Sequence, residues 1–264
     1  MIISTSKPAL WNSPSKERTS LRTKTQSMIR RILPVICCIS IGAFTASAQE
    51  HATVIGAGAV YELPLGTLHD RFLATNAGMV YAGAEITPHL TWIGKFEYAE
   101  FGTVNSSMLK KTVSVVQGTS AQQYKLPLPK LTMNLKTASV TAEAHMNILG
   151  FDGLESNGVI GFGFTNWVNT RSQYYDSLYV TNAATGTPVK AAVLAVPSNR
   201  QEDWSGTFNL GIELSGKIAD PVWFTVGADY KMIVGELWQA LDLDLENVAG
   251  MQFISIRAGL KAKL

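Results

Sequence analysis

The sequence predicts an all-β fold in which one antiparallel up-and-down β-barrel crosses a membrane. Three observations predict it: an export leader near the N-terminus, eight later segments in which apolar and polar residues alternate, and connections that are alternately short and long. A strand of about 9 to 11 residues can cross a bilayer at a tilt, and the eight segments come close to this length. They are 51–61, 78–86, 90–98, 137–148, 158–167, 208–215, 222–233 and 254–264.

Residues 28–48 have the composition of a cleaved signal peptide. Arg30 and Arg31 give a positive start, a mostly apolar stretch follows, and the segment ends in Ala-Ser-Ala, the small-residue pattern that signal peptidase reads. The apolar stretch would form about 20 Å of helix, which is too short for a hydrocarbon core of roughly 30 Å. We therefore expect 49–264 to be the mature barrel domain. Residues 1–27 are polar and basic, and we expect them to be an extension upstream of the true start.

The mature segment is mildly acidic and contains no cysteine. Residues 1–48 hold seven of the 22 Lys and Arg residues and one of the 20 acidic residues, so 15 basic and 19 acidic residues remain in 49–264. This balance gives no sign of a nucleic-acid partner. Both cysteines lie in the leader, and the four histidines lack metal-ligand spacing. We expect no disulfide, no metal and no cofactor in the mature chain.

Each predicted strand has one apolar face and one face on which charged residues alternate with glycine. In 254–264 the even-numbered positions are all Ile, Ala or Leu, and the odd-numbered positions are Ser, Arg, Gly or Lys. A soluble sandwich or a lipocalin-like barrel would also show alternation. A solvent-facing surface with so many glycines would be poor strand material, whereas glycine in a narrow lumen makes room for long charged neighbours. We therefore expect the apolar faces to meet lipid.

The connections sort into two kinds, as in outer-membrane barrels, which have short periplasmic turns and long extracellular loops. The short links are 87–89, 148–157 (with Asp152-Gly153 and Asn157-Gly158) and 219–221, and the long links are 62–76, 104–134, 170–203 and 235–250. Link 170–203 has two apolar runs around Asn-Ala-Ala-Thr-Gly, so it is either a hairpin above the membrane or an unpatterned loop. If that hairpin joined the wall, the barrel would have ten strands.

Aromatic residues near the strand ends predict the belts that lie at both membrane interfaces. They are Tyr61, Trp92, Tyr98, Trp167, Trp204 and Tyr230. Trp223 falls on the inward face by parity, so it is a candidate lumen residue instead.

The inward faces carry charges of both signs, which make up the candidate site. The set is Glu85, Lys95, Glu97, Glu143, His145, Glu213, Asp229, Lys231, Arg257 and Lys261. One hypothesis is a gated ion path, and the other is a salt-bridged plug. We favour the plug, because the interior of an eight-stranded barrel is just wide enough for side chains and buried charges of both signs persist only when paired.

The sequence gives little support for an enzyme. Glu143 and His145 share one face, where an acid could orient a general base, but Asn147 takes the next position on that face and no nucleophile is evident. His69 and Asp70 in the first long loop form only a weak match to a protease site. We expect a structural or surface-interaction role, with loops 104–134 and 170–203 as the contact surface, and we keep a narrow ion or solute channel as the alternative.

Residues 51–264 resemble the small eight-stranded outer-membrane β-barrels of the OmpA-like and opacity-protein-like kind. The resemblance rests on the architecture, on Gly-Met-Val-Tyr-Ala-Gly-Ala-Glu-Ile at 78–86, on the hairpin into 90–98, and on the amphipathic last strand. It implies an outer membrane of a Gram-negative bacterium, with membrane lipid as surroundings and insertion by the barrel-assembly machinery. Members often end on an aromatic residue that this machinery reads, whereas this sequence ends on Leu264.

Overall fold

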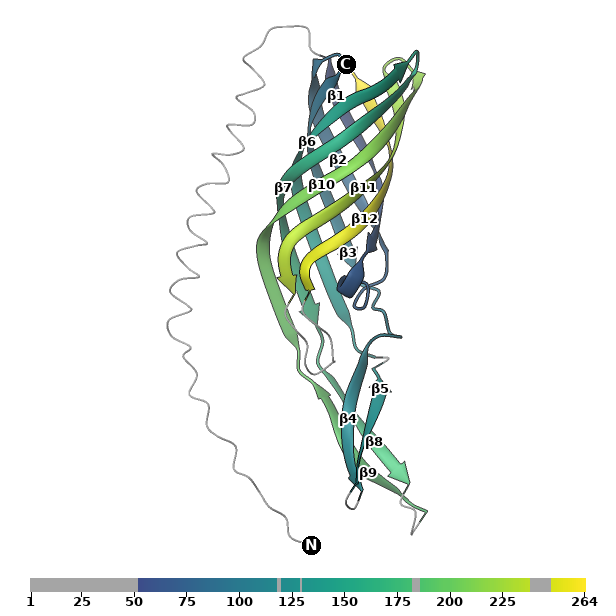
Figure 1. The fold of residues 1–264 in the computed structure, drawn as a ribbon, viewed down its shortest axis with the longest axis vertical. Helices are drawn as coiled ribbons and strands as arrows, with labels where there is room; N and C mark the ends of the chain where they lie inside the picture. The colour runs from purple at the N-terminus through teal and green to yellow at the C-terminus, as the bar shows by residue number, and fades with distance from the viewer. Residues whose placement is uncertain (1–51, 118–119, 129, 182–185, 238–247) are drawn as a thin grey trace, which may run out of the picture. The chain divides into compact units, whose positions relative to one another are not determined.

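Eight antiparallel strands close into one barrel in the computed structural model, which describes residues 52–117, 120–128, 130–181, 186–237 and 248–264. Their order around the wall is β1-β12-β11-β10-β7-β6-β3-β2, and β1 pairs with β12 to close it (Figure 1). Their bounds are β1 (Thr53–Pro64), β2 (Thr75–Thr87), β3 (Leu90–Phe101), β6 (Met133–Phe151), β7 (Leu154–Arg171), β10 (Asn199–Ala219), β11 (Val222–Leu237) and β12 (Val248–Lys263). The eight-stranded fold is confirmed, and the ten-stranded alternative is wrong. The expected leader, 28–48, and the extension, 1–27, lie outside the described residues.

Two β-hairpins extend from the end of the barrel that carries the long connections (Figure 1). β4 (Lys110–Gln117) pairs with β5 (Ser120–Pro127), and β8 (Tyr174–Thr181) pairs with β9 (Pro188–Val196), each outside the barrel sheet. The second hairpin is one of the two expectations for link 170–203, whereas the pattern of 104–134 does not predict the first. We call this end of the barrel the loop end and the opposite end the turn end.

The turn end has three tight turns, at residues 88–89, 152–153 and 220–221. The middle turn is shorter than the predicted link 148–157. The chain reverses at Asp152-Gly153, and Asn157 and Gly158 already belong to β7. Gly153 has a φ of 77°, the left-handed conformation that a two-residue hairpin turn uses and that glycine adopts without strain. The alternation of faces therefore begins directly after the turn.

The wall is apolar outside and polar inside. The outward side chains of Phe162 and Leu210 are 58% and 49% exposed, whereas Asp229 and Arg257 on the inner face are 5% and 3% exposed. So large an apolar outer surface is unfavourable in water and favourable in lipid, and a closed barrel leaves no unpaired backbone edge in the bilayer. The inner glycines make room for long side chains, since a Cβ at Gly227 would lie 2.7 Å from Nε of Arg257.

Aromatic side chains follow the expected belts with one correction. The exposed ones are Tyr61, Trp92, Tyr98 and Trp204. Trp167 is wrong as a belt residue, because it is buried and its indole N–H donates a hydrogen bond of 2.9 Å to Ser205. Phe164 faces outward, so the two-residue period of a strand turns position 167 inward.

Apolar side chains fill the interior of the loop end. The short helix η1 (Gly66–Leu68) packs against β12, and the ring of Phe101 lies between those of Phe72 and Phe253, with centroid distances of 6.4 and 5.3 Å. The fully buried members are Leu68, Phe72, Phe101, Leu109, Leu128, Leu131, Leu135, Ile233, Leu237 and Phe253. We call this set the apolar seal. Within the described ranges, no helix is long and apolar enough to cross a bilayer.

Candidate functional site

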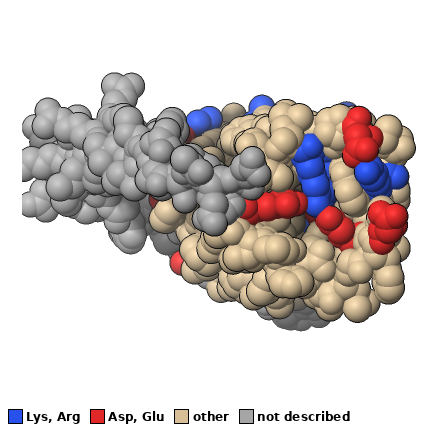
Figure 2. Space-filling model, turned by 90° about the horizontal axis from the view of Figure 1, so that it is seen from above, with Lys and Arg blue, Asp and Glu red and all other residues tan. Residues whose placement is uncertain are grey.

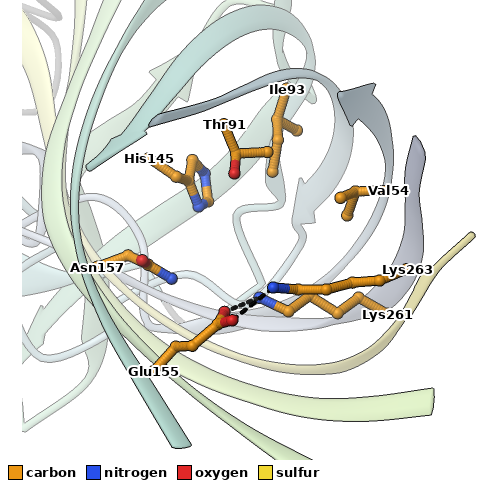
Figure 3. Close-up of a pocket in the computed structure, with 8 residues that line it drawn as sticks. All are labelled: Val54, Thr91, Ile93, His145, Glu155, Asn157, Lys261 and Lys263. Carbon is orange, nitrogen blue, oxygen red and sulfur yellow. Dashed lines mark hydrogen bonds and ion pairs between the residues drawn. The ribbon is translucent and has the colours of Figure 1, made fainter. Parts of the chain in front are cut away.

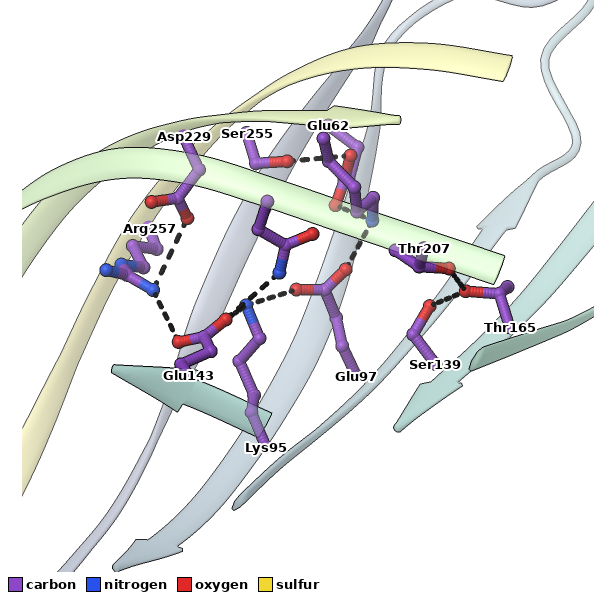
Figure 4. Close-up of polar contacts among 12 residues, drawn as sticks. Glu62, Lys95, Glu97, Ser139, Glu143, Thr165, Thr207, Asp229, Ser255 and Arg257 are labelled. Carbon is purple, nitrogen blue, oxygen red and sulfur yellow. Dashed lines mark hydrogen bonds and ion pairs between the residues drawn. The ribbon is translucent and has the colours of Figure 1, made fainter. Parts of the chain in front are cut away.

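The structure places the ten candidate charged residues along the inside of the barrel. Nine are buried there: Lys95, Glu97, Glu143, His145, Glu213, Asp229, Lys231, Arg257 and Lys261. Glu85 lies nearer the turn-end mouth, where 30% of its side chain is exposed. Their ion pairs link strands on all sides of the lumen (Figure 4), and we call the resulting run of pairs the charge column.

The part of the column next to the apolar seal is centred on Lys231. Its ammonium group contacts Glu62 at 2.5 Å and also pairs with Glu97, and it lies 5.1 Å from the ring centre of Phe253. The hydroxyl of Ser255 donates a second hydrogen bond to Glu62, at 3.0 Å. Glu62 is fully buried, and the sequence reasoning missed it because the predicted strand ended one residue earlier. Its parity, opposite to the outward Tyr61, would have placed it inside.

The middle of the column joins two cations to a shared carboxylate. The carboxylate of Glu143 forms ion pairs with the ammonium of Lys95, at 2.5 Å, and with the guanidinium of Arg257, at 3.4 Å (Figure 4). Arg257 also contacts Glu213 at 3.4 Å and Asp229 at 3.3 Å. One guanidinium group therefore touches carboxylates from three other strands, which makes Arg257 the most connected cation of the column.

His145 lies between two acids. Its Nε2 is 3.1 Å from Glu143, and its Nδ1 is 3.6 Å from Glu213. Ser215 lies close by, but its hydroxyl accepts from Lys261 at 2.7 Å and donates to Glu213 at 3.1 Å. Both ring nitrogens are thus committed to carboxylates, and within the described ranges no hydrogen bond joins the imidazole to a hydroxyl or thiol. The expected pairing of Glu143 with His145 is present without a nucleophile.

The turn-end mouth holds the last pairs of the column. Lys261 contacts Glu213 at 3.4 Å and Glu155 at 3.7 Å, and Lys263 contacts Glu155 at 2.5 Å and Glu85 at 2.8 Å. A small pocket lies among these groups, and Figure 3 shows the two lysines and Glu155 on one side of it and His145 on the other. Charges of both signs lie side by side at this end in Figure 2.

Two residues of the mouth were absent from the candidate set. Glu155 was missed because 148–157 was expected to be a turn, and Lys263 was assigned to the inward face but not counted among the charged set. Trp223 is inward, as its parity predicts, and its ring centre lies 4.7 Å from the ammonium of Lys263. Both omissions lie at strand ends, where a pattern reading is weakest.

The complete column contains more acids than bases. The carboxylates are those of Glu62, Glu85, Glu97, Glu143, Glu155, Glu213 and Asp229, and the cations are Lys95, Lys231, Arg257, Lys261 and Lys263. Every cation touches at least two carboxylates, so the column is a paired network rather than a row of free charges. In the described part of the chain, no group of three or more His, Cys, Asp or Glu residues is arranged to hold a metal ion.

A closed barrel of eight antiparallel strands, apolar toward lipid and polar within, defines this chain as a small outer-membrane β-barrel protein. Similar solved structures include Ail, the attachment invasion locus protein of Yersinia pestis, with 12% identity, 82% of this chain and 100% of that one covered, and a TM-score of 0.41. The neisserial surface protein NspA has 12% identity, with 80% of this chain and 97% of that one covered, and a TM-score of 0.43. A major outer membrane protein of Thermus thermophilus has 9% identity, coverage of 81% and 100%, and a TM-score of 0.49. No family model and no curated protein matches the sequence.

Proposed function

We propose that this protein is a non-conducting outer-membrane barrel that holds two β-hairpins outside the cell for contact with an extracellular partner. Outer-membrane barrels have short periplasmic turns and long extracellular loops, so the loop end faces the exterior. The apolar seal is the observation that carries the proposal, because it fills the interior at that end with fully buried side chains.

Several backbone hydrogen bonds hold the segment that completes the seal. The N–H of Leu65 donates to Gln252, that of Leu73 to Thr103, and that of Asn105 to Arg71, at 2.9, 2.9 and 3.1 Å. These bonds tie the link between β1 and β2 to β12 and to the segment that follows β3. An ion that crossed here would have to leave its water among Leu and Phe side chains and pass the buried guanidinium of Arg71. Apolar constrictions exclude ions by dewetting.

The charge column supports the same conclusion as a polar plug. Its cations are all engaged by carboxylates, and its long side chains lie over inner glycines such as Gly161, where a Cβ would be 2.8 Å from Cγ of Glu143. Such tight filling leaves little space for a continuous water path. The run of charges from the mouth to Lys231 favours a second candidate, a narrow channel, but that path ends at the apolar seal.

We propose no catalytic role, because the only His of the column has both nitrogens against carboxylates in the described structure. The interaction surface is instead assigned to the hairpins in 104–134 and 170–203. β4 and β9 lie side by side there, where the ammonium of Lys111 donates to the carbonyl of Ala195 at 2.8 Å. Tyr175 and Tyr179 of the second hairpin are 67% and 62% exposed, outside the lipid-facing band. Tyrosine is enriched at protein–protein interfaces, so these two side chains are the candidates for the contact.

Export through a cleaved leader and insertion by the barrel-assembly machinery belong to the same proposal. N-terminal sequencing of the membrane-extracted protein should begin at Gln49, and a start upstream of residue 28 would contradict the leader assignment.

Planar-bilayer recording tests the sealed barrel directly. The wild type should show almost no conductance, and Phe72→Ala should introduce a current, because Phe72 is a central side chain of the apolar seal. Phe162→Ala is the matched control, since it removes the same volume from the lipid-facing side. Steady current through the wild type would contradict the proposal and favour the channel.

A further inference from the structure

The base of the first hairpin carries two positive charges, Lys110 and Lys125, that no described acidic residue pairs with. Residues 102–132 contain four Lys and neither Asp nor Glu. In the register of β4 and β5, Lys110 pairs with Pro127 and Thr112 pairs with Lys125, so Lys110 and Lys125 are diagonal neighbours on one face. Such neighbours are about 7 to 8 Å apart, and like charges at this separation repel. Both side chains are exposed and have no ion-pair partner among the described residues.

Two other exposed cations near the loop end have acidic partners within the protein. Lys136 lies 3.2 Å from Glu100, and Arg200 lies 2.9 Å from Glu202. Lys110 and Lys125 differ from these two cations, because no described acidic residue forms an ion pair with either of them. A neighbouring anion would relieve the repulsion between them.

The position of Lys110 and Lys125 along the hairpin indicates which anion could lie next to them. The amide N–H of Leu128 donates to Leu109 at 3.2 Å and closes the hairpin base, and both leucines belong to the apolar seal. Lys110 follows directly, and Lys125 lies two residues above Pro127, or about 7 Å along the strand. The pair thus lies just beyond the seal at the loop end. We infer that this is the level of the headgroups that surround a barrel in a bilayer.

We propose that Lys110 and Lys125 bind the anionic phosphate headgroups of the outer leaflet and fix the base of the first hairpin to the membrane surface. Two ammonium groups on flexible stems can converge on one phosphate or contact two neighbouring ones. This inference rests on the proposed orientation of the loop end toward the exterior. It assigns to the first hairpin a partner that the fold supplies, whereas the exposed tyrosines of the second hairpin stay free for an extracellular molecule.

Lysine acetylation followed by mass spectrometry tests the proposal on the folded protein in vesicles. One set of vesicles is phosphatidylcholine alone, and in the other half of the lipid is phosphatidylglycerol. Acetylation of Lys110 and Lys125 should slow by about five-fold in the anionic vesicles, as expected for lysines near an anionic surface. Lys190 is the internal control, because it is exposed on β9 six residues from Val196, or about 20 Å further out, and its rate should change little.

The double variant Lys110→Gln/Lys125→Gln gives an independent readout. The wild type should melt at a higher temperature in the anionic vesicles than in neutral ones, the double variant should lose most of that difference, and Lys190→Gln should keep it. Equal acetylation of Lys110 and Lys125 in both kinds of vesicle would overturn the proposal. Protection by soluble dextran sulfate in neutral vesicles, without an effect of phosphatidylglycerol, would overturn it in favour of a polysaccharide partner. If Lys190 were unreactive from outside the vesicles, the proposed orientation itself would fail, which is a separate result.

Discussion

Replacing Arg257 by Ala should destabilise the barrel by about 3 to 5 kcal/mol, the cost of leaving a buried charge without its partner. Arg257 is 3% exposed and contacts Glu143, Glu213 and Asp229 at 3.3 to 3.4 Å. Glu143 keeps Lys95 and Glu213 keeps Lys261, but Asp229 has no other ion pair among the described residues. The loss therefore falls mainly on Asp229, which lies too deep for water to replace the guanidinium.

Urea unfolding in lipid vesicles measures this loss, with two companion variants. Lys136→Ala removes an exposed partner of Glu100 and should cost no more than about 1 kcal/mol. Asp229→Asn in the Arg257→Ala background should recover part of the loss, because it removes the orphaned charge. If Arg257→Ala cost as little as Lys136→Ala, the column would be hydrated and the plug interpretation would be refuted.

Three further predictions concern the wall, the lumen and the second hairpin. Leu210→Arg puts a charge into the lipid-facing band and should cost about 2 to 4 kcal/mol in the same unfolding assay, and a negligible loss would contradict the outward face of β10. Gly227→Ala should destabilise the barrel because its Cβ would meet Arg257. Gly78→Ala should be tolerated, because nothing lies within 4 Å of the new Cβ. Equal melting temperatures of the two variants would show that the lumen has room for the extra methyl group. Hydrogen bonds from the backbone N–H of Ser177 and from the hydroxyl of Tyr174 lower the pKa of Asp176 below its ordinary value of 3.8. The stability that these bonds give the hairpin is therefore present above pH 3.8 and is lost as the pH falls through the pKa of the folded state. A carboxyl titration of Asp176 by NMR with a midpoint at or above 3.8 would disagree.

Period-two alternation was sufficient to predict the wall of the barrel. It assigned Leu210 to lipid and Glu213 to the lumen because the pleat of a strand allows only these two directions, and a slip of one residue would exchange every face. The same rule failed where a strand continued beyond its predicted end. Glu62 and Glu155 were excluded from the candidate set for this reason, although their parity was correct.

The apolar seal could not be predicted from local patterns. Leu68 and Phe72 lie in a link between strands, and they become interior residues only through contact with parts of the chain far away in sequence, including Phe101 and Phe253. Without those contacts, an apolar residue in a long loop is indistinguishable from an exposed one. The ion-pair partners of Arg257 were unpredictable for the same reason, because alternation gives a direction into the lumen and no height along it.

The sequence separation of the ion pairs has a consequence for how the barrel is made. Lys231 and Glu62 are 169 residues apart, and Ser255 and Glu62 are 193 apart, across the seam where β12 meets β1. Arg257 of β12 pairs with Glu143, Glu213 and Asp229, so a chain that lacks its last strand exposes these three carboxylates without it. Non-local contacts of this kind form late, after the entropy of the long intervening loops has been lost. Closing the seam and neutralising the lumen are therefore one event, and an unfinished barrel carries a net negative interior that favours water over lipid.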